Sequence, residues 1–301
     1  MRLTEFYGIA DSVPFLDVNV EHDSALFLDP RSIRLAAGPH PHAATARDQL
    51  DSFFDTITSC VLSTDATIHA RGLELLQNFS EPWETRLGLS ARGCLGHGGA
   101  DEVGRWIWET LNTNADAFFR IGVLRQVEDI STFVTGVAED ITSDLTTRIV
   151  YDSLAGFTAD MMDHYPQLAR RTQRAPRRAW DCSGGWVEHD IELPVANGRP
   201  VLLVPRDWAR NSLMMGSRRY YSRAILDYFQ QQQTIQVSGH RFQPSKEVLR
   251  RRDATAYSRP LVLDTTVTAA HHGQDLMKQF KALIDAEYTP LTNDMLERKT
   301  R

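Results

Sequence analysis

The chain has 301 residues, of which 42% are hydrophobic and 24% charged, and a formal net charge of −6, values typical of a soluble globular protein with one large domain or two smaller ones. Its apolar runs fall short of the roughly 18–20 residues that span a bilayer, and residues 1–18 lack the apolar core of a secretory signal. Cys60, Cys94 and Cys182 are odd in number and far apart, which excludes a disulfide framework and a CxxC zinc site. We therefore expect a cytoplasmic protein without membrane contact.

Local patterns in the first part of the chain predict short strands followed by helices. Residues 13–20 partly alternate between apolar and polar side chains, and residues 25–30 form a short apolar run that Asp-Pro ends. After a turn-rich loop at residues 36–42, apolar residues at helical spacing predict helices over residues 43–63 and 68–79.

A glycine-rich stretch with Gly96, Gly98 and Gly99 precedes another predicted helix. Glycines before a helix can cradle a phosphate group. The stretch has no Walker lysine, however, and Asp101 and Glu102 in the first helical turn would repel an anion. We interpret it as a structural loop, with an anion site as the alternative.

Residues 139–161 predict a helix with an acidic edge. One stripe holds apolar residues at steps of three to five, namely Ile141, Leu145, Ile149, Leu154, Phe157 and Met161. Asp140, Asp144 and Arg148 form a row beside the stripe, and the order of Asp144 and Arg148 suits an ion pair one turn apart. The row indicates a solvated edge. The alternatives are a polar contact with another part of the protein and a metal site, which usually takes carboxylates from more than one element.

Residues 166–180 are rich in arginine and contain Pro176, which would break a helix. The segment is either a solvated, linker-like face or a binding patch, because arginine forks match phosphate oxygens. Trp180 and Trp186 are aromatic neighbours of the kind that stack on bases. The candidates for binding a nucleic acid or a protein partner are Arg170, Arg171, Arg174, Arg177 and Arg178.

The remaining sequence predicts a hairpin and several helices. Asn197-Gly198 between two apolar runs is a strong hairpin signal, which places a hairpin at about residues 191–205. Apolar spacing predicts helices over residues 216–232, 244–252 and 271–287. We therefore predict a helix-rich α/β or α+β fold with a small mixed sheet that includes this hairpin.

Charge divides the chain into two parts. Residues 1–165 hold 11 Lys/Arg against 25 Asp/Glu, a balance of −14, whereas residues 166–301 hold 22 against 14, a balance of +8. Such asymmetry is typical of a polyanion-binding face or of two parts that attract each other. We interpret residues 1–165 as an acidic N-terminal α/β part and residues 166–301 as a basic C-terminal part, packed as one compact unit.

The sequence contains no complete catalytic motif: GxSxG, HExxH, GxGxxG and a Walker lysine are all missing, which leaves open whether the protein is an enzyme. Residues 187–193 would place alternate carboxylates on one face of a strand, which is similar to half of a metal-nuclease site. The lysine that such a site needs two positions after an acid occurs only in Glu297-Arg298-Lys299. We expect no metal and no cofactor. The alternative is a nuclease that uses Mg²⁺, with four weak catalytic candidates: Asp140, Asp144, Asp190 and Glu192.

Three segments carry a family resemblance: FLDVNVEHDSALFLDP (15–30), VEDISTFVTGVAEDITSDLTTRIVYDSLAGFT (127–158) and IELPVANGRPVLLVPRDW (191–208). They resemble a bacterial family of little-known function that occurs near phage-defence and other mobile-element genes. Longer members of that family continue into a C-terminal nuclease-like domain of the D…[DE]xK type. This chain resembles their N-terminal region and departs from them where that domain would begin, so the resemblance assigns no functional residue.

The resemblance implies an accessory or regulatory component of a bacterial antiviral defence-type system. Such a component would bind nucleic acid or a protein partner, for example the product of a neighbouring gene. A metal-dependent nuclease and a purely structural subunit are the alternatives.

Overall fold

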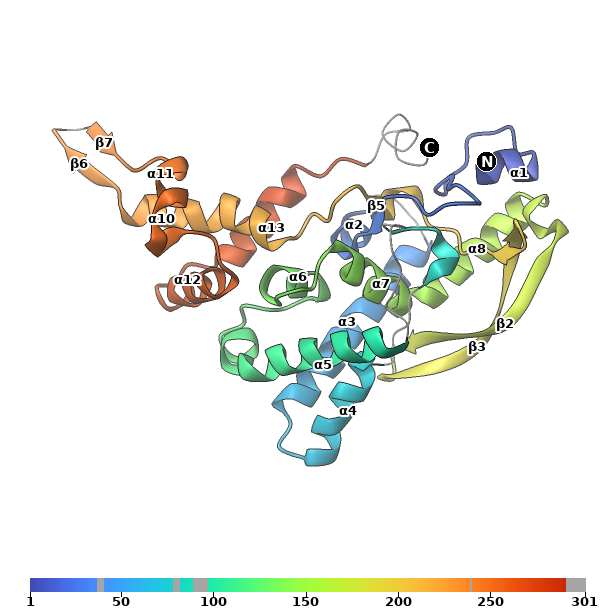
Figure 1. Cartoon of the computed structure of the whole chain (residues 1–301), viewed down its shortest axis with the longest axis horizontal. Helices are drawn as coiled ribbons and strands as arrows, with labels where there is room; N and C mark the ends of the chain where they lie inside the picture. Colours follow the sequence, from blue (N-terminus) through green and yellow to red (C-terminus); the bar gives the residue numbers. More distant parts are fainter. Residues whose placement is uncertain (37–40, 78–81, 89–96, 239, 291–301) are drawn as a thin grey trace.

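The computed structural model describes residues 1–36, 41–77, 82–88, 97–238 and 240–290. It is 57% helical with 15% strand, which confirms the predicted helix-rich α/β or α+β fold. Figure 1 shows an elongated molecule, in which a helical body carries a long two-stranded ribbon on one side and a small hairpin at the opposite end. Among the described residues, no helix combines the length and the apolar composition that a membrane crossing requires.

Five helices form the body of the molecule. The helix α3 (Pro41–Leu62) packs against α7 (Glu139–Ile149) and α8 (Tyr151–His164), and α4 (Ala66–Gln77) packs against α5 (His97–Thr113) (Figure 1). The buried face of α3 is the apolar stripe that the sequence shows, with Leu50, Phe53 and Ile57 almost inaccessible. The two helices predicted in this part of the sequence are therefore confirmed.

The described strands pair in small antiparallel sheets, so the sheet is antiparallel rather than mixed. Asn197 (φ 50°) and Gly198 (φ 76°) form the tight turn of the predicted hairpin, since both residue types tolerate the left-handed region. The sheets are β1 (Phe27–Leu28) with β5 (Ala209–Arg210); β2 (Thr172–Asp181) with β3 (Gly185–Ala196) and β4 (Arg199–Pro200); and β6 (Ile235–Val237) with β7 (His240–Phe242).

Short helices fill the rest of the described chain, and several begin at a side-chain cap. Asp29, Ser245, Ser258 and Asp275 each accept a hydrogen bond from a backbone N–H in the first turn of the helix that follows. In chain order these helices are α1 (Leu3–Tyr7), α2 (Pro30–Leu35), η1 (Trp83–Thr85), η2 (Asp116–Arg120), η3 (Val127–Asp129), α6 (Ile130–Phe133), η4 (Leu168–Arg170), η5 (Arg206–Trp208), α9 (Ser217–Tyr220), η6 (Tyr221–Ile225), α10 (Leu226–Gln232), α11 (Lys246–Arg251), η7 (Asp253–Thr255), α12 (Arg259–His271) and α13 (Leu276–Ala286).

One main apolar cluster runs through both halves of the sequence, from Leu16 to Ile284. The largest side chains that it buries completely include Trp180, Trp208 and Tyr220. Because the same cluster takes in residues from both sides of position 165, the acidic and basic parts of the sequence share a core.

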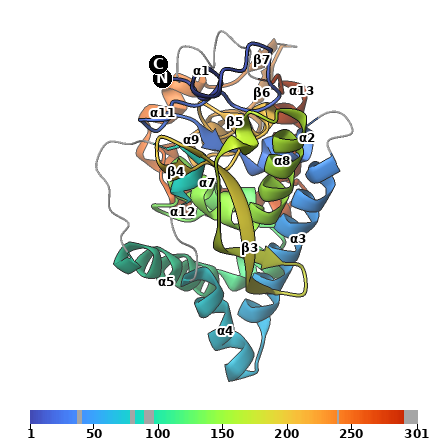
Figure 2. The same ribbon diagram turned by 90° about the vertical axis from the view of Figure 1, so that its right-hand side faces the viewer.

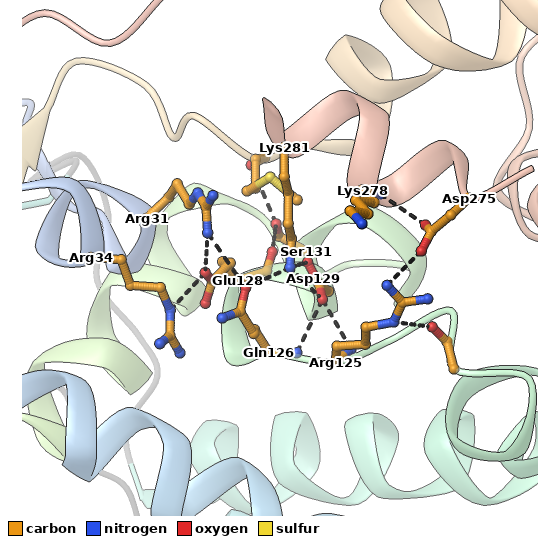
Figure 3. A network of polar contacts seen from close by, with 12 residues as sticks. Arg31, Arg34, Arg125, Gln126, Glu128, Asp129, Ser131, Asp275, Lys278 and Lys281 are labelled. Atoms are coloured by element: carbon orange, nitrogen blue, oxygen red, sulfur yellow. Dashed lines mark hydrogen bonds and ion pairs between the residues drawn. The ribbon is translucent and has the colours of Figure 1, made fainter. Parts of the chain in front are cut away.

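Buried ion pairs add to this shared core where α13 meets α2 and η3. Lys281 Nζ lies 2.8 Å from Asp129 Oδ1, and Arg31 Nε donates to Asp285 Oδ1 at 2.9 Å. Figure 3 shows Lys281 of α13 pointing at Asp129, which has no accessible surface. The C-terminal helices are therefore held to the body by specific polar contacts as well as by apolar packing.

Three local expectations differ from the structure. Instead of the two predicted strands, the first 30 residues form the short helix α1, the two-residue strand β1 and isolated bridges, because apolar side chains such as Val13 and Val18 enter the core without strand pairing. Most of the arginine-rich segment, interpreted as a linker-like face or a binding patch, belongs to the strand β2. Pro176 is compatible with it because β2 lies at the edge of its sheet. The helix predicted over residues 139–161 is divided at Val150, which takes a non-helical ψ of 20°.

Candidate functional site

Two of the three arginines of β2 lie directly opposite carboxylates of β3. The strand register pairs Arg174 with Glu192 and Arg178 with Glu188, and Asp190 lies between these two carboxylates on the same face. The ribbon that carries them runs beside α7 and α8 (Figure 2). The sequence therefore correctly places alternate carboxylates on one face of a strand, but arginines accompany them.

These cross-strand pairs reduce the positive charge of the ribbon. The guanidinium of Arg174 lies 3.1 Å from Glu192 Oε2, and that of Arg178 lies 3.7 Å from Glu188 Oε1. Hydrogen bonds from Thr172 and Arg174 lower the pKa of Glu192. Two arginines and three carboxylates therefore share this face, which is not a uniformly basic surface.

Arg177 points the other way, into the body of the molecule. Its Nε lies 3.0 Å from Oε1 of Glu84, a carboxylate that is only 2% exposed. Arg148 of α7 reaches the same carboxylate at 3.6 Å, and the hydroxyl of Tyr151 donates to it at 3.3 Å. We call these four residues, Glu84, Arg148, Tyr151 and Arg177, the Glu84 cluster.

The five arginines predicted to bind a partner are thus distributed over three environments. Arg174 and Arg178 oppose carboxylates, Arg177 belongs to the Glu84 cluster, and Arg170 and Arg171 are exposed where η4 leads into β2. The structure does not bring all five together on one face.

The helix α7 is mostly buried, so the interpretation of its row of charged residues as a solvated edge fits Asp140 but is wrong for Arg148. Asp140 is exposed and Asp144 is partly buried, but Arg148 and the hydroxyl residues are almost inaccessible. Burial of the hydroxyl groups is compatible with stability because they form hydrogen bonds inside the protein. Thr146 and Thr147 donate to carbonyl groups one turn earlier, and Ser143 Oγ accepts the N–H of Leu28 at 2.9 Å. The buried polar residues of α7 are Thr142, Ser143, Thr146, Thr147 and Arg148.

The four weak nuclease candidates lie on two different elements. Asp140 and Asp144 belong to α7, whereas Asp190 and Glu192 belong to β3. Within the described ranges, no three His, Cys, Asp or Glu side chains come together in a group that could hold a metal ion. The structure therefore gives these four carboxylates no common centre.

A second basic segment, which the sequence reasoning did not select, extends from Thr234 to Arg252. It contains the β6–β7 hairpin and α11, and we call it the basic arm. It holds five Lys/Arg residues against the single acid Glu247. Figure 1 shows this hairpin at one end of the long axis, away from the helical body.

The two faces of the β6–β7 hairpin differ in chemistry. The register pairs Ile235 with Phe242 and Val237 with His240, so these four side chains share one face. Ile235, Val237 and Phe242 are 60%, 51% and 54% exposed, although side chains of this kind are usually buried. Arg241 lies on the opposite face, together with Gln236.

Three arginines of the basic arm form side-chain hydrogen bonds with neutral groups rather than ion pairs. Arg241, Arg250 and Arg252 donate to the neutral groups Thr234 Oγ1, Ser222 Oγ and Gln233 Oε1. Among the residues that the structure describes, no carboxylate forms an ion pair with any of them. Lys246 and Arg251, by contrast, pair with Asp227 and Glu247. The run Arg250-Arg251-Arg252 was the sequence signal for this surface, but only the pairing pattern distinguishes it from β2.

A family model described as a domain of unknown function, DUF8370, matches residues 8–215. No curated protein and no solved structure matches the chain. The matched region contains the ribbon and the Glu84 cluster, whereas the basic arm lies outside it. Because the match covers more than half of the chain, the protein belongs to the DUF8370 family.

Proposed function

We propose that the protein is an accessory or regulatory binding component of a bacterial defence-type system and that its basic arm binds nucleic acid. The defence-type context is supported by the resemblance of residues 15–30, 127–158 and 191–208 to a family found near such genes. The nucleic-acid role is supported by one observation: Arg241, Arg250 and Arg252 are exposed and paired only with neutral groups.

Guanidinium groups without carboxylate partners are suited to phosphate. Each contact with a phosphate releases counterions, whereas an arginine that already pairs with a carboxylate must first break that pair. Phe242 and His240 add exposed rings on the face of the hairpin opposite Arg241, and such rings can stack on unpaired bases. Nucleic acid therefore fits the basic arm better than the ribbon, where Arg174 and Arg178 oppose carboxylates.

A protein partner is the second candidate for the same arm. The exposed face with Ile235, Val237 and Phe242 is apolar, and apolar surface exposed on a hairpin is typical of a protein interface. In that case the apolar face, rather than the three arginines, would carry the affinity.

The test compares native protein with a variant in which Arg241, Arg250 and Arg252 are changed to Gln. Fluorescence anisotropy measures binding to single-stranded and double-stranded DNA and RNA of equal length. If the three arginines contact phosphates, the affinity of the native protein falls roughly 20- to 40-fold between 50 mM and 200 mM salt, and the variant loses most of this dependence.

The matched control removes the same charge from arginines that pair with carboxylates. Arg120, Arg174 and Arg178 pair with Asp116, Glu192 and Glu188, and their joint change to Gln should leave binding nearly unchanged. A loss of binding in the control alone would move the site to the ribbon. No binding by native protein at low salt would remove the nucleic-acid role and leave the protein partner.

A further inference from the structure

A cavity of about 370 Å³ lies where the matched domain ends at Met215 and the C-terminal helices begin. This size is within the range of about 300–1,000 Å³ that small-molecule sites occupy. Its walls come from four segments: α6 with Ser131, the turn before α7 with Val137, residues 212–213 and 215–219, and the approach to α12 with Tyr257 and Arg259. The cavity is separate from the basic arm.

Two arginines on its wall have no carboxylate partner among the described residues. The guanidinium of Arg218 lies over the ring of Tyr257, 4.7 Å from its centre, and Arg259 Nη1 donates to the carbonyl oxygens of Ser131 and Val134 at 2.8 and 2.6 Å. Arg219, in contrast, forms an ion pair with Glu287 at 3.0 Å. The wall therefore holds two cations that the described part of the protein does not neutralise.

The hydroxyl group of Ser217 also indicates that the cavity is a ligand site. Ser217 lines the cavity and is only 5% exposed, yet its Oγ has no hydrogen-bond partner in the described part of the chain. Buried polar groups are nearly always satisfied, since an unmade hydrogen bond there lowers stability. A ligand in the cavity would supply the missing acceptor.

Much of the rest of the wall is apolar, since Val137, Leu213, Met215 and the ring of Tyr257 line the same cavity. Glu139 is the carboxylate among the described lining residues, and its Oε1 accepts the N–H of Leu213 at 3.0 Å. This hydrogen bond holds one oxygen of Glu139 against the backbone. The wall of the cavity thus contains both positively charged and apolar side chains.

We propose that this cavity binds a small organic phosphate monoester, with the phosphate at Arg218, Arg259 and Ser217 and the apolar portion against Val137, Leu213 and Met215. Two guanidinium groups and a hydroxyl offer at least three donors, which match the three terminal oxygens of a phosphate better than the two oxygens of a carboxylate. Occupation would link the matched domain to the C-terminal helices, since both contribute to the wall.

Isothermal titration calorimetry on the full chain tests this proposal with AMP, CMP and glucose 6-phosphate as probes. Adenosine, cytidine and glucose serve as their uncharged counterparts. At least one monoester should bind saturably with a one-to-one stoichiometry, and its counterpart should not bind. Arg218→Gln should weaken binding about tenfold or more, as expected for the loss of a hydrogen bond to a charged group.

Two further variants separate the cavity from general charge effects. Ser217→Ala should weaken binding by a smaller factor without lowering the melting temperature, because it removes a hydroxyl that has no partner among the residues that the structure describes. Arg223→Gln is the control, since Arg223 lies one turn from Arg219 but pairs with Glu287 and does not line the cavity. Failure of all three monoesters to bind native protein at millimolar concentration, or equal binding in all variants, would overturn the proposal.

Discussion

Glu84 is a buried carboxylate on which two arginines converge. Its oxygens lie 3.0 Å from Arg177 Nε and 3.6 Å from Arg148 Nη2, and the side chains of these arginines are only 18% and 7% exposed. Burial removes hydration from all three charges, so each depends on the others for compensation. The cluster joins four elements from different parts of the sequence: η1, α7, α8 and β2.

Replacing Glu84 with Gln should therefore lower the free energy of unfolding by about 3–5 kcal/mol, because two guanidinium groups would lose their counter-charge in a buried site. Urea denaturation followed by circular dichroism measures the change. Glu188→Gln is the matched control, since Glu188 also faces an arginine but its side chain is 64% exposed, and it should change stability by less than about 1 kcal/mol. Equal effects of the two variants would show that burial does not govern these ion pairs.

The Glu84 cluster also shows that a local sequence pattern cannot predict ion-pair partners that are distant in sequence. Helical spacing relates Arg148 only to residues three or four positions away, such as Asp144. Its structural partner lies 64 positions earlier in a short helical turn, and the third member, Arg177, comes from a strand. Because no local pattern relates these three residues, the sequence predicts a solvated edge for an arginine that is buried in the structure.

At the level of elements, the predictions that hold are those that local chemistry determines. The stripe of α3 and the Asn197-Gly198 turn each depend on a few neighbouring residues, and both are confirmed. The strand β2 is different. It becomes a strand because β3 lies opposite, with Trp180 facing Trp186 and Arg174 facing Glu192, and its own arginines and proline gave no such signal.

The turn of the β3–β4 hairpin gives a test at this level. Gly198 has a φ of 76°, and an added Cβ would meet no atom within 4 Å, so Gly198→Ala isolates the backbone cost of the left-handed region. We expect the free energy of unfolding to fall by about 1–2 kcal/mol. Gly216→Ala is the control, because that site is equally open but its φ of −173° suits any residue, and its effect should stay within about 0.5 kcal/mol. Equal losses in chemical denaturation would contradict this origin.

For the whole molecule, some charged residues of the two parts of the chain form ion pairs with each other inside the structure. Residues 1–215 carry 19 Lys/Arg against 30 Asp/Glu, and residues 216–301 carry 14 against 9. Lys281 meets Asp129, Arg31 meets Asp285, and Arg125 Nη1 lies 2.6 Å from Asp275 Oδ2 (Figure 3). The contact of Lys281 with Asp129 pairs a base of the second part with an acid of the first, as internal attraction predicts. The other two contacts pair arginines of the acidic first part with aspartates of the basic second part, so they do not follow from the division of charge.

The pair of Asp129 and Lys281 joins η3 to α13 and allows a test of how the C-terminal helices are held. Asp129 has no accessible surface, and burial raises its pKa, while Lys281 and the backbone N–H of Arg125 oppose that shift. Removing the ammonium group with Lys281→Met should leave an isolated buried carboxylate and lower the free energy of unfolding by about 3–5 kcal/mol. Hydrogen exchange should become faster in both α13 and η3, because the lost contact joins these two elements.

Two further variants identify the buried charge as the cause. Lys278→Met removes an exposed ammonium group from the same helix and should change stability by less than about 1 kcal/mol. The double variant Asp129→Asn with Lys281→Met removes both charges, and the amide oxygen that replaces the carboxylate can still accept the N–H groups of Arg125 and Gln126, which Asp129 accepts at 3.0 Å. It should therefore be more stable than Lys281→Met alone, since no isolated charge remains in the interior. If the two substitutions instead lower stability additively, the C-terminal helices are held by apolar packing, and the ion pair contributes little to the union of the matched domain with the rest of the chain.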